Sequence, residues 1–438
     1  MATVEEPQVR VDEEHTAAVG VTAAGEIAIA IEEPARPPGR VPPGQWLRDN
    51  LFRSVGSSLL TVAFGAALAY IGFRLLRFAF VTAEWDVVRR NLRLFVVGRF
   101  PADELWRVWA AVFTLGAATG FVIGVGAAAA ADLAQAQGRL PERTSPLALV
   151  RRYWPLIMVI AVGIGFTRTV LPGLLLVGAV ALLLGGRLVG VRARKLAKLV
   201  WLIVLVAVIG SVQVVSAFGG VAWDRWGGLL VTLFVTVAGI TFATPLGIAL
   251  ALGRRSSLPA LRWVAVSFIE LFRGVPLVTL LLMGQFVVPL FFPNTVEPPS
   301  GLTRAIIAVT MFEAAYVAEV VRGGLQAVAK GQHEAAMALG LGPWATMRRI
   351  VMPQALRNVL PAMVGQFISL FKDTSLLAVL GYLELLRVVQ TTVNQPEFLG
   401  RGLHTVAYAF VALIYWAVSY SMSRESRRLE RRLGVGER

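Results

Sequence analysis

His333 is followed by a glutamate in the stretch GQHEAAMALGLGPW, which runs from Gly331 to Trp344. On a helix, a second histidine four residues after the first would place two imidazoles on one face, as a zinc hydrolase requires. That position is Met337 in this chain. The remaining histidines, His15 and His404, are far away in the sequence. The spacing therefore argues against a zinc site.

The same stretch has the local signals of two short helices. The alanine-rich segment 334–339 favours helix. Gly340 and Gly342 should end it, and Pro343 can open a second helix, which we expect to run to about Ile350 and to end near Pro353. An ion pair of Glu334 with Arg348 or Arg349 could brace this unit. The predicted helix-turn-helix carries four apolar side chains: Met337, Leu341, Trp344 and Met347.

The composition indicates a membrane protein. Of the 438 residues, 56% are hydrophobic and only 16% are charged, and the mean hydropathy is +0.67, which is beyond the range of ordinary soluble domains. The chain has no cysteine, so disulfides and thiolate metal sites are excluded. The net charge of +15 is typical of membrane topology, and no basic module with interleaved aromatics indicates nucleic acid binding.

Apolar segments close to the length that a bilayer requires recur along the chain, and they predict an all-α polytopic protein of about 8–10 transmembrane helices. The expected spans are residues 57–80, 107–131, 154–167 with 170–190, 198–216, 226–252, 263–290, 304–322, 357–380 and 403–422.

Basic residues are unequally divided between the two sides of the last five spans. One side carries fourteen and the other carries four, and the richer side should face the cytoplasm. The fourteen are Arg254, Arg255, Arg262, Arg322, Lys330, Arg348, Arg349, Arg357, Arg424, Arg427, Arg428, Arg431, Arg432 and Arg438, and the four are Arg225, Arg304, Arg387 and Arg401. Residues 323–356 are therefore expected to form a long cytoplasmic loop, and such long loops tend to be functional.

The spacing in this loop resembles that of a known family. Glu334-Ala335-Ala336 is followed after three residues by Gly340, and after nine more by Ile350, then Met352 and Pro353. This resembles the EAA loop of ABC importer permeases, with Met352 in place of the usual leucine. The resemblance implies that Glu334, Ala335, Ala336, Gly340, Gly342, Ile350 and Pro353 couple the chain to an ATP-hydrolysing subunit. The alternative is an amphipathic loop helix resting on the bilayer.

Further segments are similar to the polar amino-acid permeases within this family. These are ELFRGVPL at 270–277, AAYVAEVVRGGLQAVAKGQHEAAMALGLG at 314–342 and FKDTSLLAVLG at 371–381, within a resemblance that covers about 223–433. LFVVGRFPADELWR at 94–107 also resembles an external segment of one permease subunit of general L-amino-acid importers of Gram-negative bacteria.

The resemblance implies a domain organisation. Residues 1–45, with a net charge of −5 and a proline-rich end, should be a disordered cytoplasmic tail. Residues 46–222 should form an N-terminal transmembrane extension with an external segment at about 82–106. Residues 223–422 should form a five-helix type I importer core with the coupling loop 323–356, and 423–438 a basic cytoplasmic tail.

The resemblance also implies partners and a location. The partners would be a homologous permease subunit, two ATP-binding subunits, a soluble or lipid-anchored amino-acid-binding protein, an amino-acid substrate and the lipid bilayer. The location would be the bacterial inner membrane, with both termini cytoplasmic. No Gly-Lys pair is present, so the chain lacks a Walker A loop. ATP and Mg²⁺ would be held by a partner, and the chain would be a transport subunit rather than an enzyme.

Polar residues at membrane depth are candidates for the transport path, because such residues are costly there. Glu313, Tyr316 and Glu319 fall within about 120° of one helix face. A substrate ammonium would suit Glu313 or Glu319, and its carboxylate would suit the segment Lys372, Asp373, Thr374 and Ser375. The structural alternatives are a Glu319–Arg322 pair and a fold anchor at Lys372 and Asp373.

Glu270 and Arg273 are three residues apart and could form an intrahelical pair. Gly274 and Pro276 would permit a break that lines the path, so we expect a gating or structural role for these four residues. A different class of function is a secondary transporter driven by an ion gradient. That class predicts inverted repeats and buried coupling carboxylates, and the sequence shows no convincing repeat.

Overall fold

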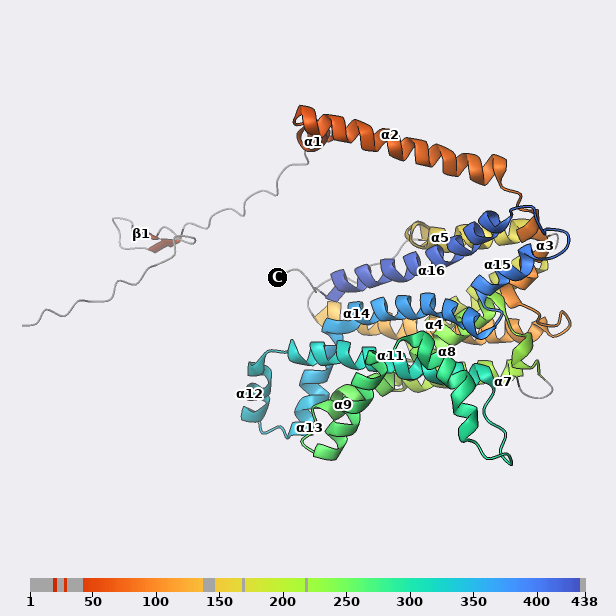
Figure 1. The fold of residues 1–438 in the computed structure, drawn as a ribbon. Helices are drawn as coiled ribbons and strands as arrows, with labels where there is room; N and C mark the ends of the chain where they lie inside the picture. Colours follow the sequence, from red (N-terminus) through yellow and green to blue (C-terminus); the bar gives the residue numbers. More distant parts are fainter. Residues whose placement is uncertain are drawn as a thin grey trace, which may run out of the picture. The chain divides into compact units, whose positions relative to one another are not determined.

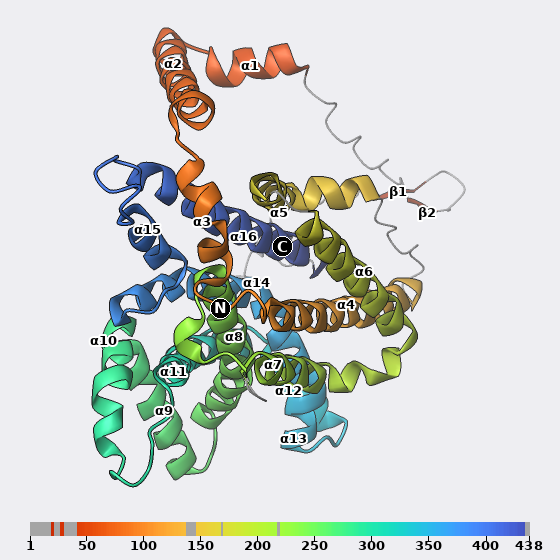
Figure 2. The ribbon, with the colours of Figure 1, turned by 90° about the vertical axis from the view of Figure 1, so that its right-hand side faces the viewer.

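The computed structural model describes residues 19–21, 27–29, 42–136, 146–167, 170–216 and 220–433. They belong to two compact units, Met1–Ala83 and Glu84–Arg438, and each is described by itself. Figures 1 and 2 show that nearly all regular structure is helical, which confirms the all-α prediction. The exception is a short antiparallel pair, β1 (Val19–Val21) and β2 (Ile27–Ile29). The rest of the predicted disordered tail 1–45 lies outside the described residues, apart from the start of α1.

The first unit otherwise consists of α1 (Pro43–Leu51) and α2 (Val55–Arg77), which continues as a π-helical turn, η1 (Phe78–Thr82). Ser54 caps α2, because its side chain accepts from the Ser57 amide while the Ser57 hydroxyl accepts from the Ser54 amide. No residue of α2 is buried. A helix that is apolar on all sides is typical of a membrane span.

The second unit begins with the elements that precede α8 (Gly228–Arg254). They are α3 (Asp86–Val97), α4 (Leu105–Ala136), α5 (Pro146–Phe166), α6 (Leu171–Arg192), η2 (Arg194–Leu199), α7 (Val200–Ser216) and η3 (Trp223–Arg225). Glycines let α4 and α6 pack closely. A Cβ on Gly120 would lie 2.0 Å from the Leu183 carbonyl oxygen, and one on Gly190 would lie 2.2 Å from that of Phe121. Small residues allow such backbone contact between membrane helices.

The remaining elements are α8 (Gly228–Arg254), α9 (Pro259–Gly274), α10 (Leu277–Leu282), η4 (Met283–Val287), η5 (Val288–Phe291), α11 (Gly301–Gln326), α12 (Lys330–Ala338), α13 (Pro343–Thr346), η6 (Met347–Val351), α14 (Met352–Asp373), η7 (Thr374–Leu380), α15 (Leu385–Val393) and α16 (His404–Leu433). α11 packs against α8, α9 and α14, so it is the central helix of this region.

Among the described residues, seven helices are long and apolar enough to cross a membrane, or eight if one bent pair is a single span. The bent pair corrects the prediction of one continuous span at 263–290. α9 and the segment Leu277–Phe291 meet at 103°, because the helix stops at Gly274 and restarts after Pro276, which lacks an amide hydrogen. α11 carries Glu313, Glu319 and Arg322 in its apolar stretch, and it is absent from the seven.

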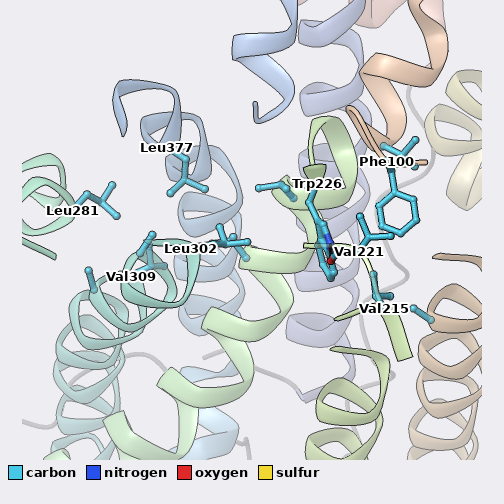
Figure 3. Close-up of a cluster of buried hydrophobic side chains, with 14 of the residues drawn as sticks. Phe100, Val215, Val221, Trp226, Leu281, Leu302, Val309 and Leu377 are labelled. Carbon is cyan, nitrogen blue, oxygen red and sulfur yellow. Dashed lines mark hydrogen bonds between the residues drawn. The ribbon is translucent and has the colours of Figure 1, made fainter. Parts of the chain in front are cut away.

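A buried apolar cluster joins the N-terminal elements to the later helices (Figure 3). Phe100 and Trp226 are almost completely buried, with ring centroids 6.3 Å apart. Trp226 donates a hydrogen bond from Nε1 to the Val221 carbonyl at 3.0 Å. Gly98 has φ +70°, and a Cβ there would lie 2.4 Å from the Cα of Gly227. The segment after α3 is therefore part of the same core as α8.

Candidate coupling site and transport path

α12 ends where the sequence predicts. Gly340 has φ +71°, a left-handed conformation that suits glycine at the end of a helix. Its amide donates to the Met337 carbonyl at 2.9 Å, and the Leu341 amide donates to the Ala336 carbonyl at 3.0 Å. These two bonds satisfy carbonyls that the helix end would leave without partners. Gly342 then precedes α13 as its N-cap residue.

The second helix does not end near Pro353, which corrects the prediction. α13, η6, α14 and η7 follow one another without a break from Pro343 to Leu380, although α13 and α14 run in different directions (Figure 1). Pro353 lies in the first turn of α14, directly after the π-helical turn Met347–Val351. A first turn tolerates proline, because amides there have no partner within the helix, and the wider π turn just before it can absorb the remaining misfit. The loop segment is therefore continuous with a candidate membrane-spanning helix.

Large apolar side chains on this segment face solvent in the isolated chain. Met337, Leu339 and Trp344 are 65%, 78% and 70% exposed, whereas Ala336 is fully buried. Glu334, Ala335 and Gly342 are also exposed, and Ile350 is half-buried. An apolar patch of this kind marks an interaction surface.

The proposed brace from Glu334 to Arg348 or Arg349 is wrong, since the described residues include no such ion pair. Instead, Gln354 donates from Nε2 to Gln332 Oε1 at 3.0 Å and joins α12 to α14. On the same segment as Gln354, Val351 and Ala355 are fully buried in an apolar cluster with residues of α11. The segment is thus held by amide hydrogen bonding and apolar packing rather than by charge.

A charged cluster joins the ends of α8, α9 and α11. Arg322 donates from Nε to Glu319 Oε1 at 2.9 Å, which confirms that expected pair. Glu319 Oε2 also lies 3.5 Å from Arg254 and 3.8 Å from Arg273.

Glu270 contacts Arg254 at 3.1 Å rather than Arg273, so the predicted intrahelical pair is wrong. The charged partner of Glu270 is Arg254 on α8, and the charged partner of Arg273 is Glu319 on α11. Arg273 also lies over the Tyr316 ring, 5.5 Å from its centroid. The four gating candidates therefore lie at the break between α9 and α10, with Gly274 at the end of α9 and Pro276 before α10.

Glu313 lies apart from this cluster. It is 2% exposed, and its Oε1 has no hydrogen-bond partner among the described residues. Asp373, at the end of α14, is close enough for its charge to act on Glu313. Thr374 is buried and donates to the Phe371 carbonyl at 2.7 Å. Ser375 is half-buried and Lys372 is exposed. The structure therefore separates the path candidates into Glu313 with Asp373, and Tyr316 with Glu319.

Sequence reasoning missed Glu384, the N-cap residue of α15. It is fully buried, and its carboxylate accepts hydrogen bonds from the amides of Leu386 at 2.7 Å and Arg387 at 2.5 Å. Tyr415 donates to it at 3.5 Å. Burial raises the pKa of Glu384 to about 7, against the opposing effect of these hydrogen bonds. The available signal was an acidic residue just before a short amphipathic helix, which is a capping pattern.

The chain is similar to several known proteins. Residues 243–435 match the family described as binding-protein-dependent transport system inner membrane component. The chain is 37% identical over 361 residues to the glutamate/glutamine/aspartate/asparagine transport system permease protein BztC of Rhodobacter capsulatus, covering 80% of this chain and 79% of that protein.

Two further similarities are shorter. The inner membrane amino-acid ABC transporter permease protein YhdY of Escherichia coli is 49% identical over 212 residues, which are 48% of this chain and 57% of that relative. A crystal structure of an amino acid ABC transporter with histidines is 32% identical, with a TM-score of 0.41, covering 46% of this chain and 90% of that one. On the similarity that spans most of its length, the chain belongs to the family of permease subunits of amino-acid ABC transporters.

Proposed function

We propose that the chain forms the membrane path of an ATP-driven importer of polar L-amino acids and is coupled to a separate ATPase through residues 330–353. The observation that carries the proposal is the unbroken helical segment from Pro343 to Leu380. A partner that moves Trp344 at the exposed end of this segment would move α14, which ends at Asp373, a residue whose charge acts on Glu313. Continuous helical structure would thus link the surface to the path.

The partners follow from this role. Two ATP-binding subunits would contact the patch made by Met337, Leu339 and Trp344, and they would hold ATP and Mg²⁺. A homologous permease would complete the path. A soluble or lipid-anchored binding protein would deliver substrate at the end of the second unit that is opposite α12 and α13. We propose an inner-membrane location with both termini cytoplasmic, supported by the excess of arginine near α12 and at the end of α16.

For the substrate, we propose that its ammonium group is bound at Glu313 and Asp373 rather than at Glu319. Glu319 already lies within 4 Å of three arginines, so its charge is neutralised within the protein. Glu313 has an oxygen without a partner, and a buried carboxylate of this kind gains most from a cationic ligand. Opening of the helix pair α11 and α14 would be needed to reach it.

The test is amino-acid uptake by cells that depend on this chain. An uncoupler removes ion gradients, whereas arsenate depletes ATP. We expect uptake to persist in uncoupled cells that retain ATP and to stop when ATP is depleted. Uptake that stops with the uncoupler while ATP remains high would instead support the secondary transporter.

A further inference from the structure

An open apolar groove lies between the α8–α9 turn and α13, which Figure 1 shows at the same end of the second unit. It encloses about 770 Å³, which is within the range of small-molecule sites. The apolar part of its wall includes Leu246, Leu250, Leu261, Val264, Trp344 and Met347. Of these, Leu261, Val264 and Trp344 are more than half exposed, so the groove is open to an occupant.

One end of the groove is polar and positively charged. It is formed by Arg255, Ser256 and Ser257. Arg254 is paired with Glu270 and Glu319, but Arg255 has no ion pair among the described residues. Its guanidinium donates only one long hydrogen bond, from Nη1 to the Leu325 carbonyl at 3.4 Å. Residues 253–262, from the end of α8 to the start of α9, include no acidic residue, so this charge is not compensated by its sequence neighbours.

We propose that the groove binds an anionic phospholipid. Its phosphate would lie at Arg255, Ser256 and Ser257, and an acyl chain would follow Leu261 and Val264 towards Trp344. An acyl chain needs no hydrogen-bond partners, whereas a peptide in so apolar a groove would leave its backbone groups unsatisfied. The site also lies directly after Arg254, the last residue of a membrane-spanning helix, which is the level of lipid headgroups.

The consequence is a lipid contact between the membrane helices and the coupling segment. The lipid would touch α8 and α9 on one side and Trp344 on the other. Membrane lipid composition would therefore influence the position of the helical segment that begins at Pro343. The inference concerns binding to the chain itself, and it does not rest on the proposed transport function.

Trp344 is a natural reporter for the test. The purified full chain in neutral detergent is titrated with phosphatidylglycerol or phosphatidylcholine brominated on the acyl chains, since bromine quenches tryptophan fluorescence on contact. Subtracting the quenching of a Trp344→Phe variant isolates the signal from Trp344. We expect this signal to saturate at about fivefold lower concentration for the anionic lipid, the effect of one cation at a headgroup.

The matched variants are Arg255→Gln and Arg262→Gln. Each removes one exposed arginine, Arg255 in the α8–α9 turn and Arg262 in the first turn of α9, but Arg262 does not line the groove. We expect Arg255→Gln to abolish the preference for the anionic lipid, Arg255→Lys to retain it, and Arg262→Gln to leave it unchanged. If Arg255→Gln does not fold, Ser257→Asp tests the same end of the groove and should also abolish the preference.

Three results would overturn the proposal. The first is equal quenching of Trp344 by the two lipids. The second is an equal loss of the preference for the anionic lipid in Arg255→Gln and Arg262→Gln, which would indicate diffuse attraction to a basic surface. The third is displacement of the brominated lipid by millimolar inorganic phosphate, which would indicate a site for a soluble anion.

Discussion

At the scale of single residues, the two buried glutamates show how differently a carboxyl group is accommodated. Glu384 has three hydrogen-bond donors, whereas Glu313 has an oxygen with none among the described residues. A buried polar group without a partner is costly, and it is most easily explained by function. Glu384 is a capping residue, and Glu313 is a candidate for ligand contact.

Replacing Glu313 by glutamine should impair transport without unfolding the protein. The amide has the same shape but loses the negative charge, and a hydrogen bond to a charged group contributes about 1.5–3 kcal/mol. We therefore expect KM for uptake to rise about tenfold or more, with normal membrane expression. Unchanged uptake kinetics and substrate profile would remove Glu313 from the path.

Glu384 should make stability depend on pH. Its pKa in the folded protein is about 7, above the ordinary value of 4.5. The folded state therefore holds this proton more tightly than the unfolded state does. Its contribution to stability is fully present below pH 4.5 and is lost as pH rises through 7, with a limit of about 3 kcal/mol.

The measurement is thermal unfolding of the purified chain between pH 5 and pH 8. We expect the wild-type melting temperature to fall as pH rises, and Glu384→Gln, which can still cap α15, to flatten this dependence. A parallel pH dependence in the two proteins would show that other groups cause it.

At the scale of elements, two backbone arrangements depend on glycine. Gly340 ends α12 in a left-handed conformation, and Gly120 and Gly190 let α4 and α6 touch through their backbones. The end of α12 depends on the positive φ of Gly340, whereas the α4–α6 contact depends on the absence of a side chain at Gly120 and Gly190. Substitutions at the two places should therefore fail for different reasons.

Gly340→Leu should uncouple the transporter. Open space surrounds Gly340, so the cost is backbone strain of about 1–2 kcal/mol, which would change the direction of α13. We expect loss of uptake and of co-purification with the ATPase, while Gly340→Asn retains both because asparagine tolerates this conformation. Gly72→Leu is the control, since Gly72 lies outside the coupling segment and is equally open but has no positive φ. Normal uptake by Gly340→Leu would contradict the coupling role.

Gly120→Leu should destabilise the N-terminal half of the second unit. The new side chain would collide with the Leu183 backbone, and α4 and α6 would have to separate. We expect a lower melting temperature and poor yield in detergent. Gly126→Leu on the same helix has no atom within 4 Å of its Cβ and should behave as wild type. Equal stability of the two variants would argue against tight α4–α6 packing.

At the scale of the whole molecule, the second unit has two poles. α12 and α13 lie at one, and α3 and α15 lie at the other (Figure 1). The ion pair between Arg90 and Glu397, at 3.1 Å, joins α3 to the segment after α15. If the coupling segment is cytoplasmic, this second pole must face outward.

The absence of cysteine from the chain makes the orientation directly testable. Met337 and Glu397 are both about 65% exposed, and each can be replaced by cysteine in turn. In intact spheroplasts, a membrane-impermeant maleimide should label Glu397→Cys but not Met337→Cys, and both should react after lysis. Labelling of Met337→Cys in intact spheroplasts would reverse the proposed topology.

Local sequence patterns were sufficient for several features. The apolar segments, the stop at Gly340 and the break allowed by Gly274 and Pro276 depend on hydropathy and on φ, which each residue or its near neighbours impose. The charge partners of Glu270 and the partial burial of Glu319 among three arginines could not be read in this way. They depend on which helices lie side by side.

The same reason explains the remaining differences. Pro353 continues a helix because a π turn precedes it, and Glu384 is buried because α15 packs against α16. Neither fact has a periodic signal in the chain. Whether a helix continues past a proline, and whether a carboxylate is enclosed, depends on energies of packing that only neighbouring elements supply. Hydropathy thus determined the class of the protein and the position of most apolar segments, and tertiary contact decided which side chains meet.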